Sequence, residues 1–355
     1  MKIVECVPNF SEGRNLEKIK LIVNEIESTP NVKLLDVAPG ESANRTVVTF
    51  IGYPEAVKEA AFKSIRKAGE VVDMRKHKGI HMRIGATDVC PFVPIAGVSM
   101  SDCIQMAHDV GKRVAFELGI PVYLYEEACQ TPDRKNLAEI RKGEYEGLEE
   151  KLKDPHWAPD YGQPVFNPKS GVVIIGARDF LIAYNINLDT SERNIAHEIA
   201  INLREAGQVK RNREGKIVRD QNGKSIRIPG KFKGVKAVGW YVEDYGVAQI
   251  SINFTNYKVS PPHIVFEEAV KTAAALGVRV TGSELVGLIP KEAMLMAGRY
   301  YIRKQGKSIR VPESKLIKVA SLSMGLNDIT PFHTRKKIIE YRMKEMKKIE
   351  PASRE

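Results

Sequence analysis

Apolar and polar residues alternate along the first half of the chain with two different periods. Several short runs are apolar at every second position, which predicts half-buried strands, and the segments between them space apolar residues three or four positions apart, which predicts amphipathic helices. In the first such helix Ile19, Ile22, Val23 and Ile26 fall on one face. The predicted elements are a strand at residues 3–7, a helix at 15–29, strands at 32–38 and 45–52, a helix at 54–72 and a strand at 88–97.

The second half repeats this order of elements. Its first predicted helix starts at Asp189 and Thr190 and ends at Gly207, residue types that commonly cap helices. Tyr245 and Gly246 form a short connection between two strand-like runs, which is typical of a hairpin. The predicted elements are a strand at residues 180–188, a helix at 189–207, strands at 234–244 and 246–257, a helix at 261–277 and a strand at 278–285.

A βαββαβ order that occurs twice predicts an α/β (α+β) fold of two ferredoxin-like subdomains, each with a mixed or antiparallel sheet and helices on its outer face. The length of 355 residues also favours two domains of roughly 150 residues each. We expect one subdomain at residues 1–179, a second at 180–342 and a charged tail at 343–355. The cleft between two such subdomains is the usual place for a small-molecule site. Further elements are expected as a helix at 100–119, strands at 121–128 and 171–177, and helices at 312–325 and 334–348.

The composition is that of an ordinary globular protein, with 43% hydrophobic and 28% charged residues and no apolar run long enough to span a bilayer. The N-terminus lacks the apolar core and cleavage site of a signal peptide, so we expect a cytoplasmic protein with no membrane partner. The four cysteines are far apart and form no CxxC pair, which argues against a disulfide framework or a zinc knuckle and predicts buried free thiols at Cys6, Cys90, Cys103 and Cys129.

A formal net charge of +11 raises the hypothesis of nucleic-acid binding. The cations are spread along the chain except for one dense cluster at residues 209–233, which carries turn-forming Gly and Asn and is interpreted as a solvated loop or a β-excursion. An RNA-binding module remains an alternative, although the chain lacks the aromatic-rich central strand that such modules use to stack bases. We therefore expect no nucleic-acid partner.

Two histidines four residues apart, His77 and His81, lie in the segment "RKHKGIHMRIGATDVCPF". A helical metal site is disfavoured because Gly79 breaks a helix and the neighbouring cations repel a metal ion. A histidine in a loop before an apolar strand is instead suited to proton transfer, and Arg83 would keep it neutral by lowering its pKa. A surface histidine in a basic loop remains the alternative.

Two further loops carry candidate chemistry. In "CVPNFSEGRN" the side chains of Asn9 and Ser11 offer hydrogen bonds and the helix that follows offers free N–H groups to an anion, although plain turn and capping chemistry explains the segment equally well. In "DYGQPVFNPKSG" prolines and glycines shape a loop whose aromatic residues, Tyr161 and Phe166, can cover a flat heterocycle, but the segment is also a plausible linker. Neither loop fits a nucleotide-binding glycine motif.

Several of these segments, taken in order, resemble the glutamate formimidoyltransferases, which correspond to the transferase domain of formimidoyltransferase-cyclodeaminase. The similarity runs from about residue 2 to residue 342, and its longest motif is the histidine segment. The matching segments are "VECVPNFSEGRN", "LLDV", "NRTVVTFIG", "RKHKGIHMRIGATDVCPFVPIAGVS", "PVYLYEEA", "GEYEGL", "PHWAPDYG", "GARDFLIAYNINL" and "GLIP".

The resemblance implies transfer of a formimidoyl group from N-formimidoyl-L-glutamate to nitrogen-5 of the co-substrate tetrahydrofolate, by a homodimer that needs no metal. It implies that His81, the second histidine of the family's H-x-G-x-H-x-R-x-G motif, is catalytic as a general acid and base. Asn9, Asn44, Arg45, Arg83 and Arg178 are expected as further substrate-binding residues, the arginines for carboxylates. The folate-contacting loop is expected at Gly162, Gln163, Pro164, Val165, Phe166, Asn167, Pro168, Lys169, Ser170 and Gly171.

The sequence also departs from the family pattern. Some members carry an acid where this chain has Ala38, and the basic segment 209–233 is longer than the usual connection. A formyl donor, N-formylglutamate, differs from the formimidoyl donor by one hydrogen-bonding group and stays open as an alternative. No cyclodeaminase domain is expected in this chain, so a separate protein would supply that step.

Overall fold

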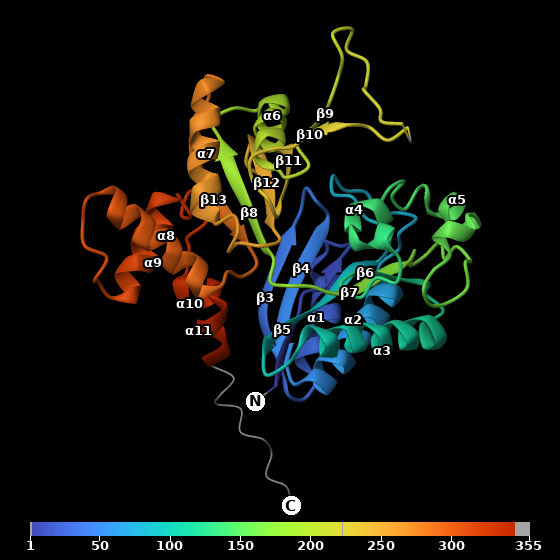
Figure 1. The fold of residues 1–355 in the computed structure, drawn as a ribbon. Helices are drawn as coiled ribbons and strands as arrows, with labels where there is room; N and C mark the ends of the chain where they lie inside the picture. Colours follow the sequence, from blue (N-terminus) through green and yellow to red (C-terminus); the bar gives the residue numbers. More distant parts are fainter. Residues whose placement is uncertain (1, 222, 345–355) are drawn as a thin grey trace, which may run out of the picture. The chain divides into compact units, whose positions relative to one another are not determined.

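The computed structural model describes residues 2–221 and 223–344. The chain divides into two compact units, which meet in sequence between Phe180 and Leu181. Each unit contains a β-sheet with helices against it (Figure 1), so the predicted α+β fold with two subdomains is confirmed. The end of the helix predicted at 334–348 and most of the predicted charged tail, residues 345–355, lie outside the described residues.

The sheet of unit 1 is mixed. β3 pairs with β4, and both β1 and β2 lie between β4 and β5 in antiparallel pairing, while β7 and β6 extend the sheet in parallel to β5. The strand predicted at residues 3–7 is β1, which ends one residue earlier, and an additional short strand, β2, follows Val7 and Pro8. The strands are β1 (Ile3–Cys6), β2 (Asn9–Phe10), β3 (Val32–Gly40), β4 (Arg45–Gly52), β5 (Thr87–Ala96), β6 (Val122–Glu126) and β7 (Val173–Ala177).

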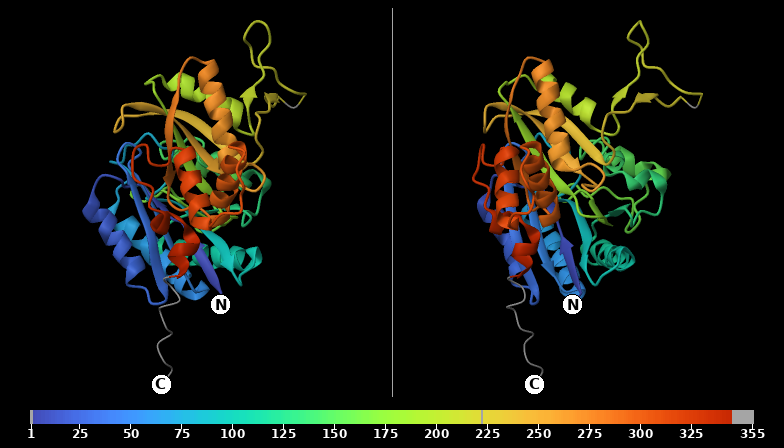
Figure 2. Two further views of the ribbon diagram at one scale, coloured as in Figure 1. Left: turned by 90° about the vertical axis from the view of Figure 1, so that its left-hand side faces the viewer. Right: turned by 60° about the vertical axis from the view of Figure 1, so that its left-hand side comes forward.

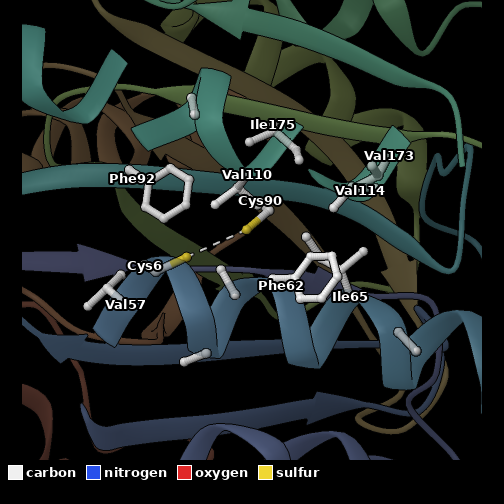
Figure 3. Packing of buried hydrophobic residues seen from close by; sticks show 14 of the residues in the cluster. Cys6, Val57, Phe62, Ile65, Cys90, Phe92, Val110, Val114, Val173 and Ile175 are labelled. Carbon is white, nitrogen blue, oxygen red and sulfur yellow. Dashed lines mark hydrogen bonds between the residues drawn. The ribbon is translucent and has the colours of Figure 1, made fainter. Parts of the chain in front are cut away.

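Three long helices cover one face of this sheet: α1 (Leu16–Glu27), α2 (Pro54–Val71) and α3 (Met100–Leu118). Their apolar faces and one set of alternate strand residues form a single core. Within it the Sγ atoms of Cys6 and Cys90 lie 3.5 Å apart, next to Val57 and Phe62 of α2 (Figure 3). Cys6, Cys90 and Cys103 are buried free thiols, as predicted, whereas Cys129 is partly exposed.

Short helices cover part of the opposite face. They lie between the strands predicted at 121–128 and 171–177, where no helix was predicted, and their residues Ile140, Leu148 and Leu152 pack against Tyr123 and Ile174 of the sheet. They are the 3₁₀ helices η1 (Pro132–Lys135) and η2 (Pro155–Trp157) and the α-helices α4 (Leu137–Ile140) and α5 (Leu148–Lys153). The candidate site described below lies on the same side of the sheet as these helices, because Asn9, Arg45 and Val89 alternate with residues of the helix-side core.

Unit 2 has a four-stranded antiparallel sheet in the order β11-β12-β8-β13. Counted along the chain, this is second, third, first and fourth strand, the same order as β3-β4-β1-β5 in unit 1. Helices α6 and α7 contact the sheet. Among the described residues no helix is both long and apolar enough to cross a membrane. The elements are β8 (Ile182–Leu188), α6 (Arg193–Leu203), β11 (Val235–Val242), β12 (Val247–Phe254), α7 (Pro262–Ala275), β13 (Val280–Val286), α8 (Lys291–Lys304), α9 (Glu313–Ser323), α10 (Thr334–Lys337) and α11 (Ile339–Lys344).

Two predicted helices of unit 2 are wrong in extent. The helix expected from residue 189 begins at Arg193, because Asp189 accepts a hydrogen bond from the backbone N–H of Arg279 instead of capping it. The helix expected at 334–348 is broken at Ile338, which is fully buried and extended and pairs with Ile289 as an isolated β-bridge. Tertiary pairing at Ile338 therefore overrides its helical spacing.

The basic segment is a β-excursion, one of its two predicted interpretations. β9 (Gln208–Val209) pairs with β10 (Arg227–Ile228), and the chain between them forms two turns bridged at Arg211–Ile217 and Arg219–Ser225. Both views of Figure 2 show it as two loops that extend away from β9 and β10. The residues of this basic segment are largely exposed, so the segment adds charge to the surface and few residues to the core.

Candidate active site

His81 lies in the loop between α2 and β5 and is half-buried. Its Nδ1 is 2.7 Å from the backbone oxygen of Met82 and 2.9 Å from Nη1 of Arg45. A carbonyl oxygen only accepts and a guanidinium only donates, so one tautomer cannot satisfy both contacts. The shorter contact favours Nδ1–H donating to Met82, which leaves Nε2 with a free lone pair.

The surroundings of His81 keep it neutral. Burial, then Arg45 and then Arg141, lower its pKa, while Asp88 and the Met82 carbonyl oppose the shift, and the net result is a pKa of about 3. The predicted direction is thus confirmed, but the predicted cause is wrong, because Arg83 contacts His77 and not His81. An imidazole that is neutral at pH 7 is in the form that a general base requires.

Asp88 organises the cations around His81. It is fully buried, and its carboxylate accepts hydrogen bonds from Arg45 Nη1 at 2.8 Å, from Arg141 Nη2 and from the backbone N–H of Ile84 at 3.1 Å. Burial alone would raise the pKa of Asp88, but Arg141 and Arg45 lower it. Asp88 reaches this position because β5 bulges: its neighbours Thr87 and Val89 both pair with β2, and Asp88 between them does not.

Arg45 connects Asp88 to Asn9. Its Nη2 and Nε donate to Oδ1 of Asn9 at 2.6 and 3.0 Å, and the amide of Asn9 donates in turn to the backbone oxygen of Val7 at 2.9 Å. Burial lowers the pKa of Arg45 to about 10, with Asp88 opposing, so the guanidinium stays charged at pH 7. The structure therefore brings together three sequence-predicted residues, Asn9, Arg45 and His81.

His77, Asn44 and Arg83 form a second polar cluster. Nε2–H of His77 donates to the backbone oxygen of Asn44 at 2.8 Å, and its Nδ1 accepts from Arg83 Nε at 3.2 Å. Arg83 also bonds Glu146 through two nitrogens, at 2.7 and 2.8 Å, and Glu144 at 3.0 Å. His77 is buried, and the side chains of this cluster form their hydrogen bonds with other residues of the chain.

The side chain of Asn44 holds the same loop from the other side. Its Oδ1 accepts from the backbone N–H of Gly13 at 2.9 Å, and its Nδ2 donates to the backbone oxygen of Lys78 at 2.8 Å. Its φ of 46° is left-handed, a conformation that Asn tolerates better than most residues. Asn44 thus links the loop between β2 and α1 to the histidine loop, the segment between α2 and β5.

The loop from Gly162 to Gly171 is joined to the histidine loop by main-chain contacts. Gly171 forms a β-bridge with Gly85, and Ala86 N–H donates to the oxygen of Ser170 at 2.8 Å. A Cβ on Gly85 would lie 1.8 Å from the oxygen of Val172, so only glycine permits this approach. The exposed residues of the loop are 163–165 and 168–169, and they include Val165 at 67% exposure.

Arg178 lies at the end of β7, in a different setting. Its backbone N–H donates to Phe92 and its Nη1 to the oxygen of Asp179. Its charge acts on Glu5 and Tyr125: burial raises the pKa of Glu5 to about 7, and Arg178 opposes that shift. The structure thus associates Arg178 with a buried carboxylate of β1.

Two residues of the site, Asp88 and Arg141, were not singled out from the sequence. Asp88 belongs to the quoted histidine segment, but its importance follows from a bulge that no short-range pattern reveals. Arg141 lies directly after α4, and its only sequence signal is that it closely precedes "GEYEGL". In the described ranges, 2–221 and 223–344, no group of three His, Cys, Asp or Glu residues could hold a metal ion.

Comparison with known proteins gives one consistent result. The formiminotransferase domain, N-terminal subdomain, matches residues 3–178, and the formiminotransferase domain matches residues 183–344. Formimidoyltransferase-cyclodeaminase of Gallus gallus is 48% identical over 340 residues, which cover 96% of this chain and 60% of that protein. The chain thus spans about 60% of the length of such bifunctional relatives.

Shorter relatives match over nearly their whole length. Glutamate formimidoyltransferase of Thermoplasma acidophilum is 42% identical over 91% of this chain and 100% of that protein, and that of Streptococcus pyogenes serotype M1 is 42% identical over 85% of this chain and 94% of that protein. Among solved structures, pitrilysin reaches a TM-score of only 0.18 at 9% identity over 97% of this chain and 41% of that chain, which supports no argument. The family matches and the identities together show that the chain belongs to the formiminotransferase family.

Proposed function

We propose that this protein is a glutamate formimidoyltransferase, which transfers the formimidoyl group of N-formimidoyl-L-glutamate to nitrogen-5 of tetrahydrofolate. Two relatives that match over nearly their whole length carry that name. The observation that carries the proposal is His81, a neutral imidazole whose Nδ1 is held by the main chain. Within the described part of the chain, no hydrogen bond involves its Nε2, which is therefore open to a substrate.

The chemistry needs one group that takes a proton and returns it. Nitrogen-5 attacks the formimidoyl carbon and loses a proton, which Nε2 of His81 accepts, and a tetrahedral intermediate forms. The carbon–nitrogen bond to glutamate then breaks as the departing nitrogen takes the proton back from Nε2, so His81 ends as it began. Bound substrate carboxylates would raise the pKa of His81 toward neutrality, because a nearby negative charge favours the imidazolium form.

The remaining predicted residues divide into two roles. We propose that the loop from Gly162 to Gly171 contacts the folate, since Gly171 at its end pairs with Gly85 of the histidine loop and residues 163–165 and 168–169 are exposed. Arg45 keeps its charge beside His81 and is proposed to face a substrate carboxylate. Asn9, Asn44, Arg83 and Arg178 are the other residues proposed to contribute to substrate binding. Of these, Asn9, Asn44 and Arg83 would act indirectly, by holding loops in place, because their side chains bond other residues of the chain.

A transfer assay tests the function. Purified protein with tetrahydrofolate and N-formimidoyl-L-glutamate should yield 5-formimidoyltetrahydrofolate, and His81→Ala should lower kcat by about 10²–10⁴-fold, the usual contribution of a general acid–base group. His156→Ala, which removes an exposed histidine of the same unit, should keep full activity. Absence of product with the wild-type protein, or full activity of His81→Ala, would refute the proposal.

The pH profile and the donor give two further readouts. Because the pKa of free His81 is so low, kcat/KM should show no acid limb near pH 6.5, and a limb there would indicate an unperturbed histidine. N-formylglutamate should be a poorer donor than N-formimidoyl-L-glutamate when the two are compared under the same conditions.

We further propose two ferredoxin-like subdomains, 1–179 and 180–342, that work together in a cytoplasmic homodimer with no nucleic-acid or membrane partner. The shared strand order of the two sheets supports the subdomain assignment. A cyclodeaminase activity would consume the product, since the bifunctional relatives carry both names. Mass measurement in solution tests the dimer.

A further inference from the structure

The turn at residues 143–148, part of the motif "GEYEGL", has no role in the chemistry proposed above. It lies between α4 and α5 and has a fixed shape. Gly143 and Glu144 are both left-handed, with φ of 87° and 53°, and Gly147 N–H donates to the oxygen of Gly143 at 2.8 Å. A Cβ on Gly147 would lie 2.8 Å from that oxygen, and Leu148 is fully buried. The core therefore anchors a turn with little freedom to move.

One side of this turn grips the histidine loop. Glu146 binds the guanidinium of Arg83 with both oxygens, and Glu144 adds a third contact at 3.0 Å. The backbone N–H of Tyr145 donates to the backbone oxygen of Arg83 at 2.9 Å. Arg83 follows His81 by two residues, so these bonds fix the segment that carries the catalytic histidine.

The other side of the turn contacts the folate loop, residues 162–171. The hydroxyl of Tyr145 donates to the backbone oxygen of Pro168 at 2.6 Å. Its ring lies 5.5 Å from the ring of Phe166, centroid to centroid, in a tilted arrangement. Tyr145 thus bonds both loops: its main chain bonds the histidine loop and its side chain bonds the folate loop.

We propose that the turn at residues 143–148 is a brace between the two loops, and that Tyr145 is a positioning residue that sets the acceptor nitrogen at its working distance from Nε2 of His81. This inference rests on the proposed function, because it takes residues 162–171 as the acceptor loop. Proton transfer needs the two nitrogens within hydrogen-bond reach, and a misplacement of about 1 Å costs up to about 100-fold in rate. Tyr145 does not touch the reacting atoms in this scheme.

The test is Tyr145→Phe, with Tyr123→Phe as its matched control. Tyr145→Phe removes the bond to Pro168 and keeps both the ring and the main-chain bond to Arg83. Tyr123 also donates its hydroxyl to a backbone oxygen, that of Trp157, but it is buried in the core of the same unit and bonds neither loop. A variant effect that only reflects lost stability should therefore appear in both proteins.

Three quantities separate positioning from stability. In Tyr145→Phe the KM for tetrahydrofolate and the dissociation constant of tetrahydrofolate, measured anaerobically by calorimetry, should rise by about 3- to 10-fold, the effect of one hydrogen bond. The kcat should fall, while the KM of the donor and the pH profile stay unchanged. Tyr123→Phe should lower the melting temperature and leave both KM values unchanged.

Unchanged affinity for tetrahydrofolate in Tyr145→Phe, or equal changes in the KM of both substrates, would overturn the brace. The binding measurement needs no turnover, so it separates this failure from failure of the proposed function. Wild-type protein that binds tetrahydrofolate but forms no product would refute the transferase and still test the brace. Wild-type protein that does not bind tetrahydrofolate would refute both.

Discussion

Replacing Asp88 with asparagine keeps the shape of the side chain and removes the charge shared by Arg141, which is buried, and Arg45, which is half-buried. Asp88 Oδ2 accepts from Arg45 at 2.8 Å and from Arg141, and Oδ1 accepts from the N–H of Ile84 at 3.1 Å. Removing one partner of a buried ion pair typically costs about 3–5 kcal/mol, because a charge is left without compensation in a poorly solvated site. Since Asp88→Asn strands two cations, we expect a loss of unfolding free energy at the upper end of that range.

The loss should depend on pH with a definite sign. Burial raises the pKa of Asp88, but Arg141 and Arg45 outweigh it and hold the folded-state pKa below the ordinary value. A depressed carboxyl pKa contributes stability that is fully present above the unfolded value, near 4, and is lost as the pH falls through the folded value. The difference between wild type and Asp88→Asn should therefore be full at pH 7 and shrink below about pH 4.

Urea unfolding at pH 7 and at pH 3 measures both effects, and a second substitution isolates their cause. Asp88→Asn combined with Arg141→Gln removes one of the stranded cations, so the double variant should lose less stability than the sum of the two single variants. A cost within about 1 kcal/mol at pH 7, well below the expected cost of a broken buried pair, would refute the reasoning. So would a cost that is the same at both pH values.

Two further substitutions test other parts of unit 1. Burial raises the pKa of Glu5 to about 7 against the effect of Arg178, so the folded carboxyl binds a proton more tightly than the unfolded one. Stability therefore falls as pH rises from about 4.5 through 7. Glu5→Gln should raise the melting temperature at pH 8 more than at pH 4, and an equal effect at both pH values would contradict this account of Glu5. Gly85→Ala places a Cβ 1.8 Å from Val172 O and should cost about 1–3 kcal/mol in thermal unfolding, whereas Gly40→Ala, with its nearest contact at 3.5 Å, is the control; equal losses would contradict the close approach.

The local spacing of apolar residues predicted most of the fold, because the helices and strands of this fold bury one face each. The apolar spacing of Ile19, Ile22, Val23 and Ile26 is the buried face of α1, and the repeated βαββαβ order reappears as two sheets with one strand order. The errors occur where a distant contact decides the backbone. Ile338 pairs with Ile289 instead of continuing its helix, and Asp189 accepts a hydrogen bond from the N–H of Arg279 instead of starting the helix predicted there.

The candidate site was predicted less completely than the fold. His81 could be found from its loop and from the resemblance, but the residues that set its pKa come from elsewhere: Arg45 from β4 and Arg141 from the end of α4. Arg83, the nearest arginine in sequence, turns to His77 and Glu146 instead. Electrostatic partners are fixed by sheet pairing and by a bulge, which spacing along the chain does not encode.

The first strand has a consequence for how the protein is made. All four residues of β1 are buried, and this strand lies between β4 and β5 and pairs with both of them. A ribosome releases Ile3–Cys6 before β4 and β5, and the sheet cannot close around that strand until β5 has also emerged. During synthesis the β5-facing edge of β1 therefore stays unpaired while more than eighty residues are added, an interval in which exposed strand edges are prone to aggregate. A tag or a run of slowly translated codons placed before β5 would change the length of that interval. The yield of soluble protein should change with it.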